Sequence, residues 1–224
     1  MTKKQLIISI GTGRSGSVSL ANFLSRQDAC IMLHEGRIED KGIRQLIHWK
    51  NDESELWKWL DYMSNWSGSN KYYGDTGMYY LPYVEEIIKR FPNTKFIGLI
   101  RNKKAVVQSY LKKTDGRNHW YLHNGKNWKL DPKWDPCYPK YEEADKEKAL
   151  GLYWEEYKTS TEELMAKYPK QVKMWTIETF NTDEGRNDIL DFIGYTLERK
   201  IKEDIKLNEI KAKKSIIDKI KEWF

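Results

Sequence analysis

The densest group of residues able to do chemistry lies near the start of the chain. An apolar run at residues 6–10 ends in the glycine-rich segment GTGRSGS, and a helix-compatible segment, residues 18–24, follows. A strand–turn–helix of this kind leaves backbone N–H groups unpaired at the positive end of a helix dipole, which favours phosphate. Glycines let the backbone approach a ligand, while the arginine and serines add charge and hydrogen-bond donors. The sequence therefore predicts a nucleotide-phosphate site made of Gly13, Arg14, Ser15, Gly16, Ser17, Val18 and Ser19.

Three kinds of phosphate-binding loop compete for this segment. A kinase-type P-loop has the pattern GxxxxGK[ST], whose lysine and hydroxyl reach the outer phosphates and Mg²⁺. Gly11 and Gly16 have that separation, but Ser17 and Val18 occupy the lysine and hydroxyl positions, which argues against ATP phosphoryl transfer. A dinucleotide-binding loop has the pattern GxGxxG, with a ribose-binding acid about 20 residues further on. The three glycines of the loop and Glu35 fit that pattern, so an NAD(P)-dependent oxidoreductase is one alternative.

A second segment favours the third kind of loop. Residues 95–113 read KFIGLIRNKKAVVQSYLKK, which predicts a strand with Arg101 at its carboxyl end and a helix with Ser109 eight residues later. Ligands of open α/β sheets bind at the carboxyl ends of strands, so both side chains are expected at the same sheet edge as the first loop.

Together, strand–GTGRSGSVSL–helix and strand–RNxxxxxxSY–helix resemble the PAPS-dependent sulfotransferases. The resemblance implies that the first loop binds the 5′-phosphosulfate of 3′-phosphoadenosine 5′-phosphosulfate (PAPS). It also implies that Arg101 and Ser109 bind the 3′-phosphate and that adenosine 3′,5′-bisphosphate (PAP) is released. Arg14 stands where many members of the family carry lysine. The implied activity is transfer of a sulfuryl group to a hydroxyl or amine of a small-molecule or glycan acceptor, without a metal.

Transfer of this kind needs a general base within reach of the acceptor proton. The segment CIMLHEG places His34 and Glu35 at the carboxyl end of the second predicted strand, beside the first loop. The family uses either a histidine or a glutamate here, and we favour Glu35 as the catalytic base, with His34 as the alternative. Neighbouring residues of an extended strand point to opposite faces, so we expect only one of them to face the site. Arg14 is also expected to be catalytic, because its charge would stabilise the leaving phosphate.

Two features are candidates for binding the acceptor. Asp75, in GDTG after the third predicted strand, is the next acid expected to face the crevice, where it would position acceptor hydroxyls or cap a turn. Residues 114–141 are polar and rich in turn residues, and they carry Trp120, an aromatic side chain suited to stacking on a sugar or a phenol. We expect this segment to be an acceptor-binding loop or lid. His119 and His123 are four residues apart, but without a third ligand nearby we expect no metal site.

Alternating strands and helices are needed to position these residues. Apolar residues at three- and four-residue steps predict helices between short apolar runs. The alternation predicts an α/β three-layer sandwich, P-loop-kinase-like, with a central and mostly parallel sheet. We expect one domain over residues 1–224, with a last amphipathic helix near residues 216–223 and basic candidates for the 3′-phosphate at Lys211, Lys213 and Lys214. The five predicted strands are residues 6–10, 29–34, 71–74, 95–100 and 171–177.

Composition narrows the remaining classes of protein. The net charge of +6 suits an anionic cosubstrate, but dispersed lysines and the lack of zinc-finger spacing give no indication of specific nucleic-acid binding. A non-catalytic nucleotide- or polyanion-binding module is the alternative from another class. No stretch approaches the roughly 20 apolar residues of a membrane span, and the first apolar run is too short for an export signal, so we expect a cytoplasmic protein. The two cysteines give no disulfide framework, and nothing indicates an oligomeric state.

Overall fold

The computed structural model describes residues 4–38, 41–50 and 53–201. The predicted C-terminal helix and the lysines at 211, 213 and 214 lie outside these residues. Short 3₁₀ turns occur at Leu81–Tyr83 and Asp135–Cys137. The helices and strands follow in the order β1 (Gln5–Ser9), α1 (Ser17–Ser25), β2 (Cys30–Leu33), β3 (Arg37–Ile38), β4 (Ile43–Arg44), α2 (Glu53–Trp66), β5 (Tyr72–Asp75), α3 (Val84–Arg90), β6 (Lys95–Ile100), α4 (Lys103–Lys113), α5 (Lys146–Lys167), β7 (Val172–Thr176), α6 (Ile177–Phe180) and α7 (Asp183–Phe192).

Five strands form one parallel sheet in the order β2-β5-β1-β6-β7. The central strand β1 pairs with β5 on one side and with β6 on the other, so that Ile8 lies opposite both Asp75 and Phe96. The outer strands β2 and β7 pair in parallel with β5 and β6. The predicted α/β architecture with a five-stranded parallel sheet is confirmed. A separate hairpin of β3 and β4, which the sequence did not predict, follows β2.

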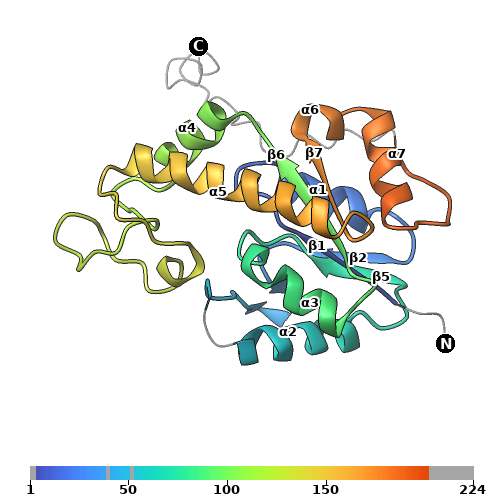
Figure 1. Ribbon diagram of the computed structural model, residues 1–224. Helices are drawn as coiled ribbons and strands as arrows, with labels where there is room; N and C mark the ends of the chain where they lie inside the picture. The colour runs from blue at the N-terminus through green and yellow to red at the C-terminus, as the bar shows by residue number, and fades with distance from the viewer. Residues whose placement is uncertain (1–3, 39–40, 51–52, 202–224) are drawn as a thin grey trace, which may run out of the picture.

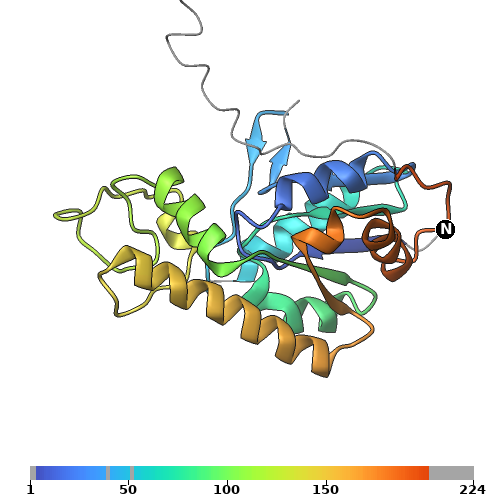
Figure 2. The ribbon, with the colours of Figure 1, turned by 90° about the horizontal axis from the view of Figure 1, so that it is seen from above.

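Helices cover both faces of the sheet and give the three layers seen in Figures 1 and 2. Successive residues of β1 face opposite layers, as they must in a strand. Ile7 belongs to an apolar core with Leu20 of α1 and Ile189 of α7. Ile8 belongs to the other core, which includes Leu150 of α5. Among the described residues, no helix is both long and apolar enough to cross a membrane.

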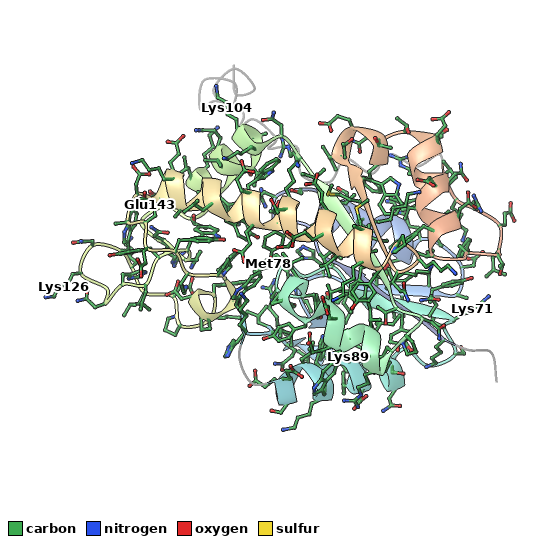
Figure 3. All side chains as sticks on the ribbon, viewed as in Figure 1. Lys71, Met78, Lys89, Lys104, Lys126 and Glu143 are labelled. Atoms are coloured by element: carbon green, nitrogen blue, oxygen red, sulfur yellow. The ribbon has the colours of Figure 1, made fainter. Side chains whose placement is uncertain are left out.

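The segment of residues 114–141 leaves the layers and projects to the left in Figure 1. Figure 3 places Lys126 at its outer end, away from the sheet. Its base is fixed to the body, because the Tyr141 N–H donates to the Trp120 carbonyl oxygen at 2.8 Å. The rings of Tyr110 on α4 and Tyr153 on α5 pack against Trp120, with centroids 4.8 and 5.7 Å away. The segment therefore has an anchored base beside α4 and α5.

Candidate functional site

The turn between β1 and α1 packs tightly against its surroundings. A Cβ on Gly11 would collide with the backbone of Leu99, and a Cβ on Gly13 would collide with the hydroxyl of Tyr110. The Gly13 N–H donates to the Tyr153 hydroxyl at 3.2 Å, so this donor of the predicted site already has a partner. The turn is therefore held in one shape by contacts that only glycine permits.

Ser15 is the one predicted loop residue whose side chain turns inward. It is buried, and its hydroxyl lies 2.6 Å from the Thr12 hydroxyl. This bond closes the turn from within. Because this hydroxyl is buried and Ser15 does not line the cavity described below, the side chain is not placed to donate to a ligand there, contrary to our expectation.

Helix α1 begins at Ser17 with an N-terminus that no side chain caps. Gly16 precedes it with a φ of 96°, in the left-handed region that favours glycine. The first N–H groups of a helix have no intrahelical partner, and together with the helix dipole they bind anions. Arg14 also adopts a left-handed conformation, with a φ of 69°, which is uncommon outside glycine and occurs at functional turns. A geometry of this kind can accommodate an anion.

The structure brings the two predicted phosphate-binding segments together. The Arg14 Nε donates to Ser109 Oγ on α4 at 2.9 Å. The Arg101 Nη1 donates to the Arg14 carbonyl oxygen at 3.4 Å. Arg101 follows the end of β6, and its own carbonyl oxygen accepts a hydrogen bond from Trp154 Nε1 at 2.8 Å. Residues that are about 90 positions apart in sequence thus meet at one edge of the sheet.

A cavity of about 1000 Å³ opens between these groups. Its cationic side chains outnumber its carboxylates, which makes it suited to a polyanion. The cations are Arg14, Arg44, Arg101, Lys112, Lys113 and Arg117, and the carboxylates are Glu35, Asp131 and Glu178. The predicted site residues that line it are Gly13, Arg14, Gly16, Ser17, Val18, Ser19, His34, Glu35, Arg101 and Ser109.

His34 and Glu35 both line the cavity, so the expectation that only one would do so is wrong. The physical reason is that β2 ends at Leu33, one residue before the predicted end of the strand. Glu35 has a φ of 52°, and this left-handed residue breaks the alternation of an extended chain. The His34 Nδ1 consequently lies 3.9 Å from Glu35 Oε2, while His34 Nε2 lies 3.2 Å from the Ser17 hydroxyl.

Burial shifts the pKa values of both candidate bases. It raises the pKa of Glu35, and the positive charges of Arg44, Arg14 and Lys113 oppose that rise. It lowers the pKa of His34, an effect that the carboxylate of Asp75 opposes and that Arg44 reinforces. A carboxylate of raised basicity and a neutral imidazole can each accept a proton, so both meet this requirement for a general base.

Asp75 does not lie where an acceptor could touch it. Its side chain is fully buried, with an exposed fraction of 0%. Its Oδ2 accepts hydrogen bonds from the Gly36 N–H at 3.0 Å, from Tyr80 at 2.7 Å and from Tyr79 at 3.2 Å. Burial raises the pKa of this carboxyl. The predicted contact with acceptor hydroxyls is therefore corrected: Asp75 supports the turn that carries Glu35.

Trp120 is likewise outside the cavity, because its ring is fully buried in the core. It packs edge-on against Tyr138, with centroids 4.9 Å apart, and against Tyr110. The predicted stacking of Trp120 on an acceptor is therefore corrected. Other residues of the segment 114–141 line the cavity in its place, namely Thr114, Arg117, His119, Asp131, Trp134 and Tyr138.

Arg44 on β4 is a cavity residue that sequence reasoning missed. Its Nη2 lies 2.6 Å from Glu35 Oε2, and its guanidinium carbon lies 5.0 Å from the ring centroid of Trp134. An isolated arginine in a two-residue strand gives no pattern in the sequence, since only the fold places it beside the candidate base.

No profile of a known protein family matches the chain, and no curated protein matches it in sequence. Solved structures do match. A sulfotransferase from Alicyclobacillus acidocaldarius has a TM-score of 0.54 and 15% identity, over 91% of this chain and 87% of that one. Mouse sulfotransferase SULT7A1, solved in complex with PAP, has a TM-score of 0.49 and 18% identity, over 88% of this chain and 61% of that one. The first match shows that the chain has a sulfotransferase fold, which confirms the resemblance at the level of the fold.

Proposed function

We propose that this protein is a PAPS-dependent sulfotransferase that acts on a hydroxyl or amine of a small-molecule or glycan acceptor. One observation carries the proposal: a single cavity joins an uncapped helix N-terminus and its arginines to two candidate bases, His34 and Glu35. An anionic donor would bind at the helix N-terminus and the arginines, and an acceptor would lose its proton to one of the two candidate bases. The sulfotransferase fold agrees with this reading.

The residues present fit a nucleotide with two separate phosphate groups. The uncapped α1 N-terminus and Arg14 would hold the phosphosulfate. Arg101 and Ser109 would hold the 3′-phosphate, since both line the same cavity. The Arg14–Ser109 and Arg101–Arg14 hydrogen bonds support this proposal, because they would hold the two phosphate sites at a set spacing before a ligand binds. Such preorganisation lowers the cost of aligning the donor.

PAPS supplies an activated sulfuryl group, whose bond to the leaving phosphate breaks as the acceptor atom bonds to sulfur. The α1 N–H groups and Arg14 would stabilise the charge that collects on the leaving phosphate. The Glu35 carboxylate would take the acceptor proton, and His34 is the alternative base. The segment of residues 114–141 would form the acceptor side of the cavity, where Trp134 and Tyr138 offer aromatic surface.

The order of the strands argues against a dinucleotide-dependent oxidoreductase. In the dinucleotide-binding fold, the strand order 3-2-1-4-5-6 places the second strand directly beside the first. Here β5 lies between β1 and β2. Glu35 therefore follows an edge strand, one strand further from the glycine loop than a ribose-binding acid would be.

Calorimetric titration with PAP and with NADH tests the proposed cosubstrate. We expect PAP to bind and NADH not to bind, because the cavity is built from cations and an open helix N-terminus. Tight binding of NADH without binding of PAP would overturn the proposal.

Transfer of radiolabelled sulfate from PAPS to a panel of phenols, sugars and amines tests the reaction. Glu35→Gln should lower turnover by about 100-fold or more, since it removes the base, while leaving the affinity for PAP nearly unchanged. Glu162→Gln is the matched control, because Glu162 is an exposed carboxylate on α5 that pairs only with Lys158 in the described part of the chain. Normal turnover by Glu35→Gln would exclude Glu35 as the base. Binding of PAP without transfer to any member of the panel would favour a binding module.

A further inference from the structure

The hairpin of β3 and β4 places Arg44 beside Glu35, the residue two positions before the start of β3. Arg37 pairs with Arg44 across the hairpin, and the Gln45 N–H donates to the Gly36 carbonyl oxygen at 2.9 Å. The approach is so close that a Cβ on Gly36 would collide with the Gln45 carbonyl oxygen. The backbone thus fixes the distance between Arg44 and the turn that carries Glu35.

The guanidinium of Arg44 contacts both a carboxylate and an aromatic ring. Its Nη2 donates to Glu35 Oε2 at 2.6 Å, and its Nε donates to the Glu35 carbonyl oxygen at 3.4 Å. Its guanidinium carbon lies over the Trp134 ring, 5.0 Å from the ring centre. A planar guanidinium can satisfy both neighbours at once, whereas an ammonium group can serve only one of them well.

The base of the 114–141 segment holds Trp134 in place. The Trp134 N–H donates to the Asp131 backbone carbonyl at 3.0 Å, and the Asp131 N–H donates to Asp135 Oδ2 at 2.7 Å. Asp135 is itself paired with His119, whose Nδ1 lies 2.6 Å from Asp135 Oδ1. The Trp134 ring that contacts Arg44 therefore belongs to a hydrogen-bonded turn, which restricts the movement of the ring.

We propose that Arg44 is a positioning residue that aims the Glu35 carboxylate into the cavity and keeps it ionised, with Trp134 as its support. The proposal rests on the proposed function only for the role given to Glu35. In the described part of the chain, Arg44 is the residue whose side chain hydrogen-bonds this carboxylate, and it does so at Oε2. We assign the other oxygen, Oε1, to which no described residue donates, as the one that accepts the proton of a bound acceptor.

Charged and titratable groups from several elements face Glu35, and Arg44 must be weighed against them. Burial favours the protonated acid, and Arg44 is the largest opposing influence on the pKa of Glu35. The other groups are Arg14 before α1, Lys113 on α4, His34 beside it, and Tyr79, Tyr138 and Cys137. Without Arg44 the burial effect would be less opposed, so Glu35 would lose its proton at a higher pH.

The test is a pH titration of Glu35. It is monitored by the carboxyl infrared band that the wild type shows and that Glu35→Gln lacks. In Arg44→Gln the midpoint should rise by about one pH unit or more, as expected when a cation leaves a carboxylate at this distance. Arg44→Lys should restore part of the shift. Trp134→Leu should also raise the midpoint, by less, while the control Trp128→Leu in the same segment should leave it unchanged.

The outcomes separate this proposal from the proposed function. An unchanged or lowered midpoint in Arg44→Gln, or equal midpoints in Arg44→Lys and Arg44→Gln, would overturn the role of Arg44. A merely structural arginine would lower the denaturation midpoint of the protein without moving the titration. Calorimetry with PAP on the same samples reports on the cosubstrate alone. Failure of PAP to bind would therefore count against the proposed function, while the titration would still decide the role of Arg44.

Discussion

The turns that follow β1 and β2 line the same cavity, but different kinds of interaction hold them in place. The first is made of backbone: its glycines press against Leu99 and Tyr110, and it leads into an uncapped helix N-terminus. The second turn is held by side chains: the buried Asp75 carboxylate accepts a hydrogen bond from the Gly36 N–H, and the Arg44 guanidinium donates to the Glu35 carboxylate. The first turn, the candidate anion site, is thus fixed largely by local conformation, whereas the second, which carries the candidate base, depends on partners from other parts of the chain.

Gly36→Ala should have the largest effect on stability, because the added side chain does not fit in the turn after β2. The new Cβ would collide with the Gln45 backbone, at a residue whose φ is 62°. We expect the free energy of unfolding to fall by about 3 kcal/mol or more. Gly42→Ala is the matched control: its φ is also 62°, but a Cβ there meets nothing within 4 Å, so the loss should be about 1 kcal/mol. Equal urea midpoints for the two variants would show that the close contact of Gly36 with Gln45 does not add to the loss of stability.

Arg101→Ala should have the next largest effect, and it tests a side chain that bonds to the backbone of the first turn. Removal of a charged donor should weaken PAP binding by about 1.5–3 kcal/mol, measured by calorimetry. Lys104→Ala is the control, since Lys104 is exposed on the outer side of α4 and does not line the cavity (Figure 3). It should change the affinity by only a few tenths of a kcal/mol, because solvent and salt screen an exposed charge that does not line the cavity. Similar affinities for both variants would remove Arg101 from the site.

The smallest expected effect is a pH dependence of stability that comes from Asp75. Burial raises its pKa in the folded state above the ordinary 3.8, so the folded protein binds this proton more tightly than the unfolded chain does. The stability that protonated Asp75 contributes is therefore fully present below pH 3.8. It is lost as the pH rises through the pKa of Asp75 in the folded state. Relative to Asp75→Asn, wild type should lose up to about 1.4 kcal/mol of unfolding free energy per pH unit in that window. Parallel urea-midpoint profiles for the two proteins would contradict this.

The sequence was sufficient for the five strands and for the glycine turn before α1, because both depend on local patterns, but it did not predict the order of the strands in the sheet. Apolar runs mark the strands, and glycine spacing marks the turn before α1. Sequence could not separate Trp120 from Trp134, since both are aromatic residues in one polar segment and only packing decides which is buried. Nor could it find Arg44, because two-residue strands such as β3 and β4 leave no periodicity to read.

The second turn also shows how sensitive such predictions are to a single position. A strand predicted to end at His34 ends at Leu33, and the left-handed Glu35 then brings two neighbouring side chains to the same cavity. Alternation along a strand is a dependable guide only inside the strand. Beyond its last residue, the direction of a side chain is set by tertiary contacts, here those of Gly36 with Asp75 and with Gln45.

The placement of β1 at the centre of the sheet has a consequence for how the chain must fold during synthesis. Gln5 pairs with Tyr72 and Ile7 with Lys95, so β1, which is synthesised before the other four strands of the sheet, meets its neighbours only after long stretches of chain have followed. Such distant parallel pairing is slow, and an unpaired apolar strand invites association with other nascent chains. A fragment that stops before β6 would leave one edge of β1 open, so we expect truncated translation products of this length to need chaperones or to aggregate.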